Sequence, residues 1–158
     1  HTDMQSSIVG DMLSCGNWAK KALQNPFLHR LYLIGPSKHD LKSVERNKVL
    51  SFSIEELEQG ATIPLETKYP VYISIDKDVL DERYAMTNWN QGDMSLGMLE
   101  DVLAHFLKNC EVIGIDICGD DPDINDYPTY IKAERINNLS DDALYQTAMK
   151  ILKRRQKK

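Results

Sequence analysis

Four short runs of apolar and β-branched residues recur along the chain, at residues 30–35, 48–52, 71–76 and 111–117. They are mostly continuous rather than alternating, which is the pattern of strands covered on both faces. Stretches with helical patterns lie between these runs, and the alternation of strands with helices favours a parallel sheet. We therefore expect a single α/β domain over residues 1–158, built as a three-layer α/β/α sandwich with a mainly parallel sheet.

Helices are predicted over residues 18–24 and 40–47, and a capping box at Ser53 to Glu56 predicts another. The clearest helix covers about 95–109, where apolar residues recur on one side: Leu96, Leu99, Val102, Leu103, Phe106 and Leu107.

The last helix is expected over about 141–155, with Ser140 as its N-cap and an inward face of Leu144, Ala148, Ile151 and Leu152. The expected loops are residues 78–93 and 119–138. Each follows the carboxyl end of a strand, which is the edge where open α/β sheets bind ligands.

Composition narrows the class of protein. The chain has 158 residues, enough for one domain with a sizeable core, and its net charge of −5 argues against nucleic acid as a partner. No apolar run approaches the roughly 18 residues of a membrane helix, so no membrane partner is expected. The three cysteines show no C-x-x-C spacing, which favours a reducing compartment and hence a cytoplasmic protein. The oligomeric state stays open.

Two carboxylates one residue apart follow the third apolar run, as Asp76 and Asp78. An unpaired carboxylate at the rim of a sheet is costly to desolvate, and a divalent cation that prefers oxygen ligands removes that cost. The pair therefore predicts a metal site. The alternative is that the two acids cap the next turn or are solvated loop residues.

Other candidate ligands are His1 and Asp3, which form a second pair two residues apart, and Asp116, which ends the fourth strand. A mixed set of His and Asp ligands is more typical of a site for Mn²⁺ or a similar cation than of a thiolate-type zinc site. Two metals that share carboxylates lower the pKa of a bridging water and make it a nucleophile. Taken alone, the His1 pair is a weak signal at a chain terminus, and Asp116 has a structural alternative. For His29, His39 and His105 we expect ordinary structural roles.

The order of these motifs resembles the arginase/agmatinase (ureohydrolase) superfamily. Residues 1–3 (HTD) resemble the second half of its D-x-H-x-D motif, so the chain is expected to start inside that motif, with the N-terminal part of the fold missing. Residues 74–81 (SIDKDVLD) resemble its S-x-D-x-D-x-x-D element, and residues 114–117 (GIDI) resemble the segment before its late substrate-contacting acid. The resemblance runs over most of the chain in the right order.

This resemblance implies that His1, Asp3, Asp76 and Asp78 ligate a binuclear Mn²⁺ centre, whose bridging hydroxide attacks a guanidinium carbon. Two positions depart from the family pattern. Cys15 stands where many relatives have a His proposed to shuttle protons, and Gly119 stands where arginases have a Glu that contacts the guanidinium, with Asp120 adjacent. Free arginine is therefore in doubt as the substrate.

Residues 15–18 (CGNW) and 88–92 (NWNQG) look more like the divergent UPF0489 branch, which includes enzymes that convert arginine to ornithine within peptides. We therefore expect a Mn²⁺-dependent hydrolase of C–N bonds in guanidino or amidino groups, acting on a small molecule or a peptide. Asp116 or Asp120 would hold the cationic substrate, and Trp89 would form a wall by cation–π contact, with ordinary packing as its alternative.

A second hypothesis is a non-catalytic metal-binding or interaction domain derived from the same fold, in which the chemistry was lost with the changes at Cys15 and Gly119. A third, a deacetylase-type amide hydrolase, lacks the tandem His pair that such chemistry would need, and it ranks last.

Overall fold

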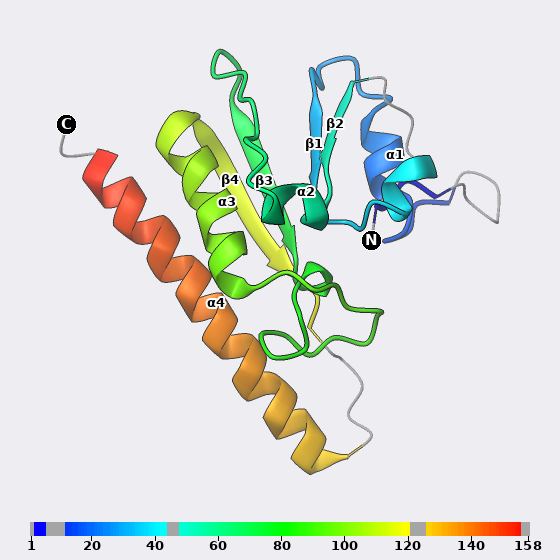
Figure 1. Cartoon of the computed structure of the whole chain (residues 1–158), viewed down its shortest axis with the longest axis vertical. Helices are drawn as coiled ribbons and strands as arrows, with labels where there is room; N and C mark the ends of the chain where they lie inside the picture. The colour runs from blue at the N-terminus through cyan, green and yellow to red at the C-terminus, as the bar shows by residue number, and fades with distance from the viewer. Residues whose placement is uncertain (1, 6–11, 44–47, 121–125, 156–158) are drawn as a thin grey trace. The chain divides into compact units, whose positions relative to one another are not determined.

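The computed structural model describes residues 2–5, 12–43, 48–120 and 126–155. It is a mixed α/β protein with parallel strand pairs, as the apolar pattern predicts (Figure 1). The chain divides into two compact units, His1–Ile63 and Pro64–Lys158, and each is described by itself.

The first unit contains α1 (Trp18–Ala22), β1 (Leu31–Ile34), the 3-10 helix η1 (Asp40–Ser43), β2 (Val49–Phe52) and α2 (Ile54–Glu58). Strands β1 and β2 pair in parallel, with Leu31 opposite Val49. The helix expected over 40–47 is instead the short η1, and residues 44–47 lie outside the described part.

The predicted capping box at the start of α2 is confirmed. The Ser53 hydroxyl accepts a hydrogen bond from the Glu56 amide at 3.2 Å, and the Glu56 carboxylate accepts one from the Ser53 amide at 2.9 Å. These reciprocal bonds satisfy two amides that would otherwise have no partner in the first turn.

The second unit contains β3 (Val71–Asp76), the 3-10 helix η2 (Lys77–Val79), α3 (Leu96–Asn109), β4 (Val112–Cys118) and α4 (Tyr127–Arg155). Strands β3 and β4 pair in parallel, and α3 and α4 lie side by side (Figure 1). Because parallel strands end at the same edge, this pairing brings the residues after β3 and β4 together.

Helix α3 matches its prediction closely. The Ser95 hydroxyl caps it by accepting from the Met98 amide at 3.2 Å. Its inward residues include the buried Leu99, Leu103, Phe106 and Leu107. Leu107 is fully buried and belongs to the core of this unit, together with Leu80, Met94 and Leu144.

The prediction for the last helix was wrong about its start. Helix α4 begins at Tyr127, so most of the expected loop 119–138 is helical from that residue onward. Two signals mark the true start: Asp126 accepts from the Thr129 amide at 3.1 Å, and Pro128 occupies the first turn, where proline is favoured. Ser140 is not a cap but lies buried inside the helix, donating to the Tyr84 carbonyl.

Buried polar residues of α4 bind the segment between η2 and α3. Asn137 is buried, accepts from the Met86 amide at 2.8 Å and donates to the Met86 carbonyl at 2.9 Å. The two bonds replace the pairing that Met86 would have had in a strand, so Asn137 fixes this segment to α4.

No helix in the described part of the chain combines the length and the apolarity needed to cross a membrane.

The Asn137 contacts generate a prediction about stability. Asn137→Ala leaves the amide and carbonyl of the half-buried Met86 without these partners, which should lower the free energy of unfolding by about 1–3 kcal/mol. The neighbouring exposed Asn138→Ala is the matched control and should change it little. Urea unfolding followed by circular dichroism measures both, and equal effects of the two variants would contradict the assigned role.

Candidate functional site

The acidic pair lies at the carboxyl end of β3. Asp76 is the last residue of the strand, and its Oδ1 accepts from the Asp78 amide at 3.0 Å, which caps η2. The capping role that we held as the alternative is therefore present in Asp76. It is compatible with metal binding, because a carboxylate that accepts one hydrogen bond keeps further lone pairs.

Both members of the pair are removed from solvent to different degrees. Asp78 is buried, with 5% of its surface exposed, and Asp76 is half-buried. Burial raises the pKa of the Asp76 carboxyl, and repulsion from Asp78 adds to that rise, while the bond from the Asp78 amide opposes it. Two carboxylates that disfavour each other's charge form an environment that a cation would stabilise.

Lys77, between the two acids, is a residue whose importance our sequence reasoning missed. It is fully buried, and its Nζ lies 2.6 Å from Asp120 Oδ1 and 3.0 Å from Asp141 Oδ1. No local pattern signalled this, because its partners Asp120 and Asp141 lie 43 and 64 residues away along the chain. Asp120, predicted to contact substrate, is placed here as an ion-pair partner.

Gly119 explains how closely the segment after β4 approaches the pair. Its φ is +94°, and a Cβ at this position would lie 2.9 Å from Asp76 Oδ1 and 2.9 Å from the Lys77 amide nitrogen. A side chain therefore does not fit without a shift of the backbone. A Glu at this position, which the resemblance to arginases would imply, has no room on this backbone.

Asp116 lies on β4 opposite Ser74 of β3. Its Oδ1 accepts from the Ser74 hydroxyl at 2.8 Å, and a hydrogen bond with Tyr72 raises the pKa of that phenol. The Tyr72 ring covers Gly114, where a Cβ would come within 2.5 Å of the ring. Asp116 thus accepts from neutral hydroxyls, which do not cancel its charge.

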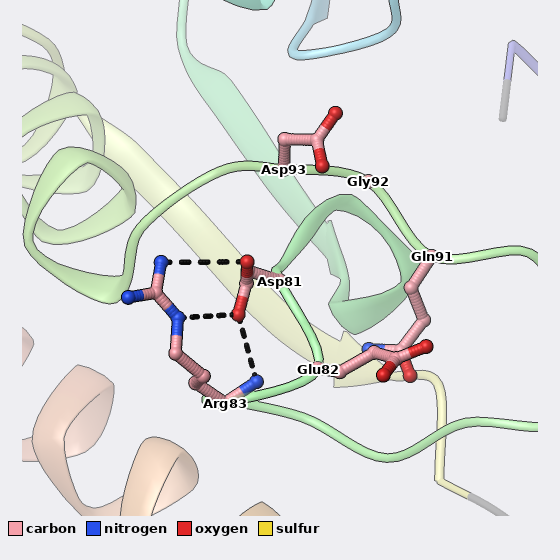
Figure 2. Close-up of a pocket in the computed structure, with 6 residues that line it drawn as sticks. All are labelled: Asp81, Glu82, Arg83, Gln91, Gly92 and Asp93. Carbon is pink, nitrogen blue, oxygen red and sulfur yellow. Dashed lines mark hydrogen bonds and ion pairs between the residues drawn. The ribbon is translucent and has the colours of Figure 1, made fainter.

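The segment after η2 forms an open pocket of about 300 Å³, lined by Asp81, Glu82, Arg83, Gln91, Gly92 and Asp93 (Figure 2). Asp81 and Arg83 face each other as an ion pair at 2.7 Å, which holds the pKa of the Asp81 carboxyl below its ordinary value. The Asp93 side chain points away from that pair (Figure 2). Gly92 donates to the Asp78 carbonyl at 2.7 Å, so the pocket adjoins the acidic motif.

The remaining predicted residues belong to other segments of the chain. Trp89 is 56% exposed in the segment between η2 and α3. In the first unit, Cys15 is exposed in a turn, and Asp3 accepts from the Trp18 indole at 2.7 Å. His1 lies outside the described residues.

The donor set near Asp76 fits part of a divalent site. Asp76 and Asp78 are hard oxygen donors of the kind that Mn²⁺ and Mg²⁺ accept. Within residues 2–5, 12–43, 48–120 and 126–155, however, no three His, Cys, Asp or Glu side chains come together as a metal-binding group. The pair would need further ligands to complete a coordination sphere.

Comparison with known proteins gives one informative relative. No family model matches the chain. A protein of Thermotoga maritima, described only as uncharacterized, is 32% identical over 127 residues, which is 80% of this chain. Those residues are 48% of the relative, so the chain spans about half the length of this curated protein.

The close approach of Gly119 to Asp76 and Lys77 predicts that adding a single methyl group at residue 119 lowers the stability of the protein. Gly119→Ala combines a positive φ with contacts of 2.9 Å to Asp76 and Lys77, so it should destabilise the protein by about 1–3 kcal/mol. Gly97→Ala, where a Cβ would meet nothing within 4 Å, is the control and should be neutral or slightly stabilising. Thermal unfolding compares them, and a neutral Gly119→Ala would show that the segment is not held against β3.

The raised pKa of Asp76 predicts a pH dependence in the presence of EDTA. The folded state binds this proton more tightly than the unfolded state, so ionisation costs stability as pH rises above the ordinary value of 3.8, and the cost is absent below it. Asp76→Asn should therefore raise the unfolding midpoint at pH 7 and have little effect near pH 3. The exposed Asp101→Asn serves as control, and a midpoint lowered by Asp76→Asn at pH 7 would contradict the prediction.

Proposed function

We propose that this protein is a Mn²⁺-dependent hydrolase of C–N bonds in guanidino or amidino groups, related to the arginase/agmatinase superfamily and its peptide-directed branch. The observation that carries the proposal is the Asp76–Asp78 pair, held at the carboxyl end of a parallel strand with one carboxylate buried. Such a pair is costly without a cation.

Asp76 and Asp78 would be ligands of the metal centre, with His1 and Asp3 as the further ligands that the resemblance implies. Bound Mn²⁺ would lower the pKa of water and so supply the nucleophile. The fold that accompanies this chemistry is a three-layer α/β/α sandwich with a mainly parallel sheet, which we propose for the chain as an arginase-like domain.

Substrate binding would depend on carboxylates. Asp116 is the better candidate for holding a guanidinium, because its hydrogen bonds with Ser74 and Tyr72 come from neutral groups. Asp120 is the weaker one, since its charge is already matched by Lys77 at 2.6 Å. The pocket beside the acidic motif adds Glu82 and Asp93, which favour a cationic ligand over an anionic one.

The second candidate is a non-catalytic domain that keeps the metal but not the reaction. The observation that favours it is the lack of space for a side chain at Gly119, where the guanidinium-contacting Glu of arginases does not fit. Cys15, exposed in a turn, likewise lacks the imidazole proposed to move protons in relatives. The two candidates share a metal site and differ in turnover.

Metal analysis followed by urea assays tests both candidates. The full-length protein, loaded with Mn²⁺ and desalted, should retain about two ions per chain. Urea release from arginine-containing peptides should then exceed release from free arginine. Bound metal with no urea from either substrate would reject the amidinohydrolase and support the non-catalytic candidate.

Asp76→Asn is the accompanying variant. It should abolish retention of Mn²⁺ while circular dichroism shows an intact fold, because an amide oxygen still accepts the Asp78 amide but no longer offers a charged ligand. Asp101→Asn, on the exposed side of α3, should retain the metal. Unchanged metal content in Asp76→Asn would show that the site has been assigned to the wrong residues.

A further inference from the structure

We propose that Lys77 is a positioning residue for the Asp76–Asp78 pair, and this inference rests on the metal site proposed above. The backbone of Lys77 joins the two acids, and its side chain bonds to the carboxylates of Asp120 and Asp141. Its ammonium is the point at which three segments meet, namely the end of β3, the residues after β4 and helix α4.

Burial of the Lys77 ammonium has a cost in free energy. A buried lysine loses its hydration, and even a well-paired buried ion is often no more stabilising than an apolar side chain of similar volume. Lys77 has a side chain only 1% exposed and two carboxylate partners within 3.0 Å. The ion cluster differs from an apolar contact in its geometric specificity, because charged hydrogen bonds hold their partners at defined distances and angles.

The two ion pairs of Lys77 hold neighbouring segments against the end of β3. Asp120, one partner of Lys77, directly follows Gly119, where an added Cβ would lie 2.9 Å from Asp76 Oδ1. The bond between Lys77 and Asp120 therefore keeps the Gly119 backbone beside Asp76. The bond to Asp141 ties the same strand end to α4. These bonds hold Lys77, whose backbone joins Asp76 to Asp78.

Loss of these bonds would leave the two carboxylates present but free to reorient. Groups behind metal ligands commonly contribute 10–100-fold to metal affinity by fixing ligand orientation. A role confined to stability, in which Lys77 only attaches α4, would leave the affinity of a folded variant unchanged. Metal affinity therefore separates positioning from simple support.

The test is Lys77→Met in the full-length protein, with Mn²⁺ binding measured by isothermal titration calorimetry and stability by urea unfolding. We expect Mn²⁺ to bind about 10–100-fold more weakly, while the unfolding midpoint is unchanged or raised. Asn137→Ala is the control: it should destabilise the same unit but leave Mn²⁺ affinity unchanged, because it does not touch the Lys77 cluster.

Asp120→Asn is a second variant that keeps the test decisive if Lys77→Met does not fold, because the Asp120 side chain is 69% exposed and its replacement buries nothing. It should weaken Mn²⁺ binding in the absence of substrate, which a purely substrate-holding Asp120 would not do. Exposed Asp142→Asn should have no effect.

The outcomes are distinguishable. If the unmodified protein does not bind Mn²⁺, the proposed function and this inference are both overturned. If it binds, and folded Lys77→Met or Asp120→Asn binds equally well, only the positioning role is overturned. The role is also overturned if Asn137→Ala weakens Mn²⁺ binding as much as they do, since affinity would then follow stability.

Discussion

The arrangement of the second unit at its acidic edge depends on the Lys77 ammonium, which is buried between the carboxylates of Asp120 and Asp141. An isolated ammonium in this position would be strongly destabilising, so the two partners must come with it. Because Asp141 belongs to α4 and Asp120 to the segment after β4, both of these parts of the chain are held at the end of β3. Gly119 then follows, because only a residue without a side chain can approach Asp76 at this distance.

The parallel register of β3 and β4 supplies the frame for this cluster. Because both strands end at one edge, Asp76 and the residues after Cys118 meet there. Strand β3 ends at Asp76, and the 3-10 helix η2 that follows carries Lys77 and Asp78. This strand end thus holds two carboxylates suited to a cation and a buried ammonium that bonds to Asp120 and Asp141.

Local chemistry was the part of the fold that could be predicted. Ser53 with Glu56 and Ser95 with Met98 form caps inside one turn, so neighbouring residues suffice to specify them. The start of α4 was missed because Ser140 was interpreted as an N-cap and residues 119–138 were expected to form a loop after a strand. The side chains of Asn137 and Ser140 instead bond to Met86 and Tyr84, more than fifty residues away, and no local pattern records such partners.

Periodicity and capping act over a few residues, so the amino-acid sequence was enough to predict the strands, the parallel α/β class and two carboxylates at a strand end. Which of the acids are available to a ligand depends instead on tertiary contacts. The tertiary structure matched Asp120 with Lys77, gave Asp116 neutral partners and closed Gly119 on Asp76. The physical reason is that desolvation and ion pairing depend on groups that the fold brings together from distant parts of the chain.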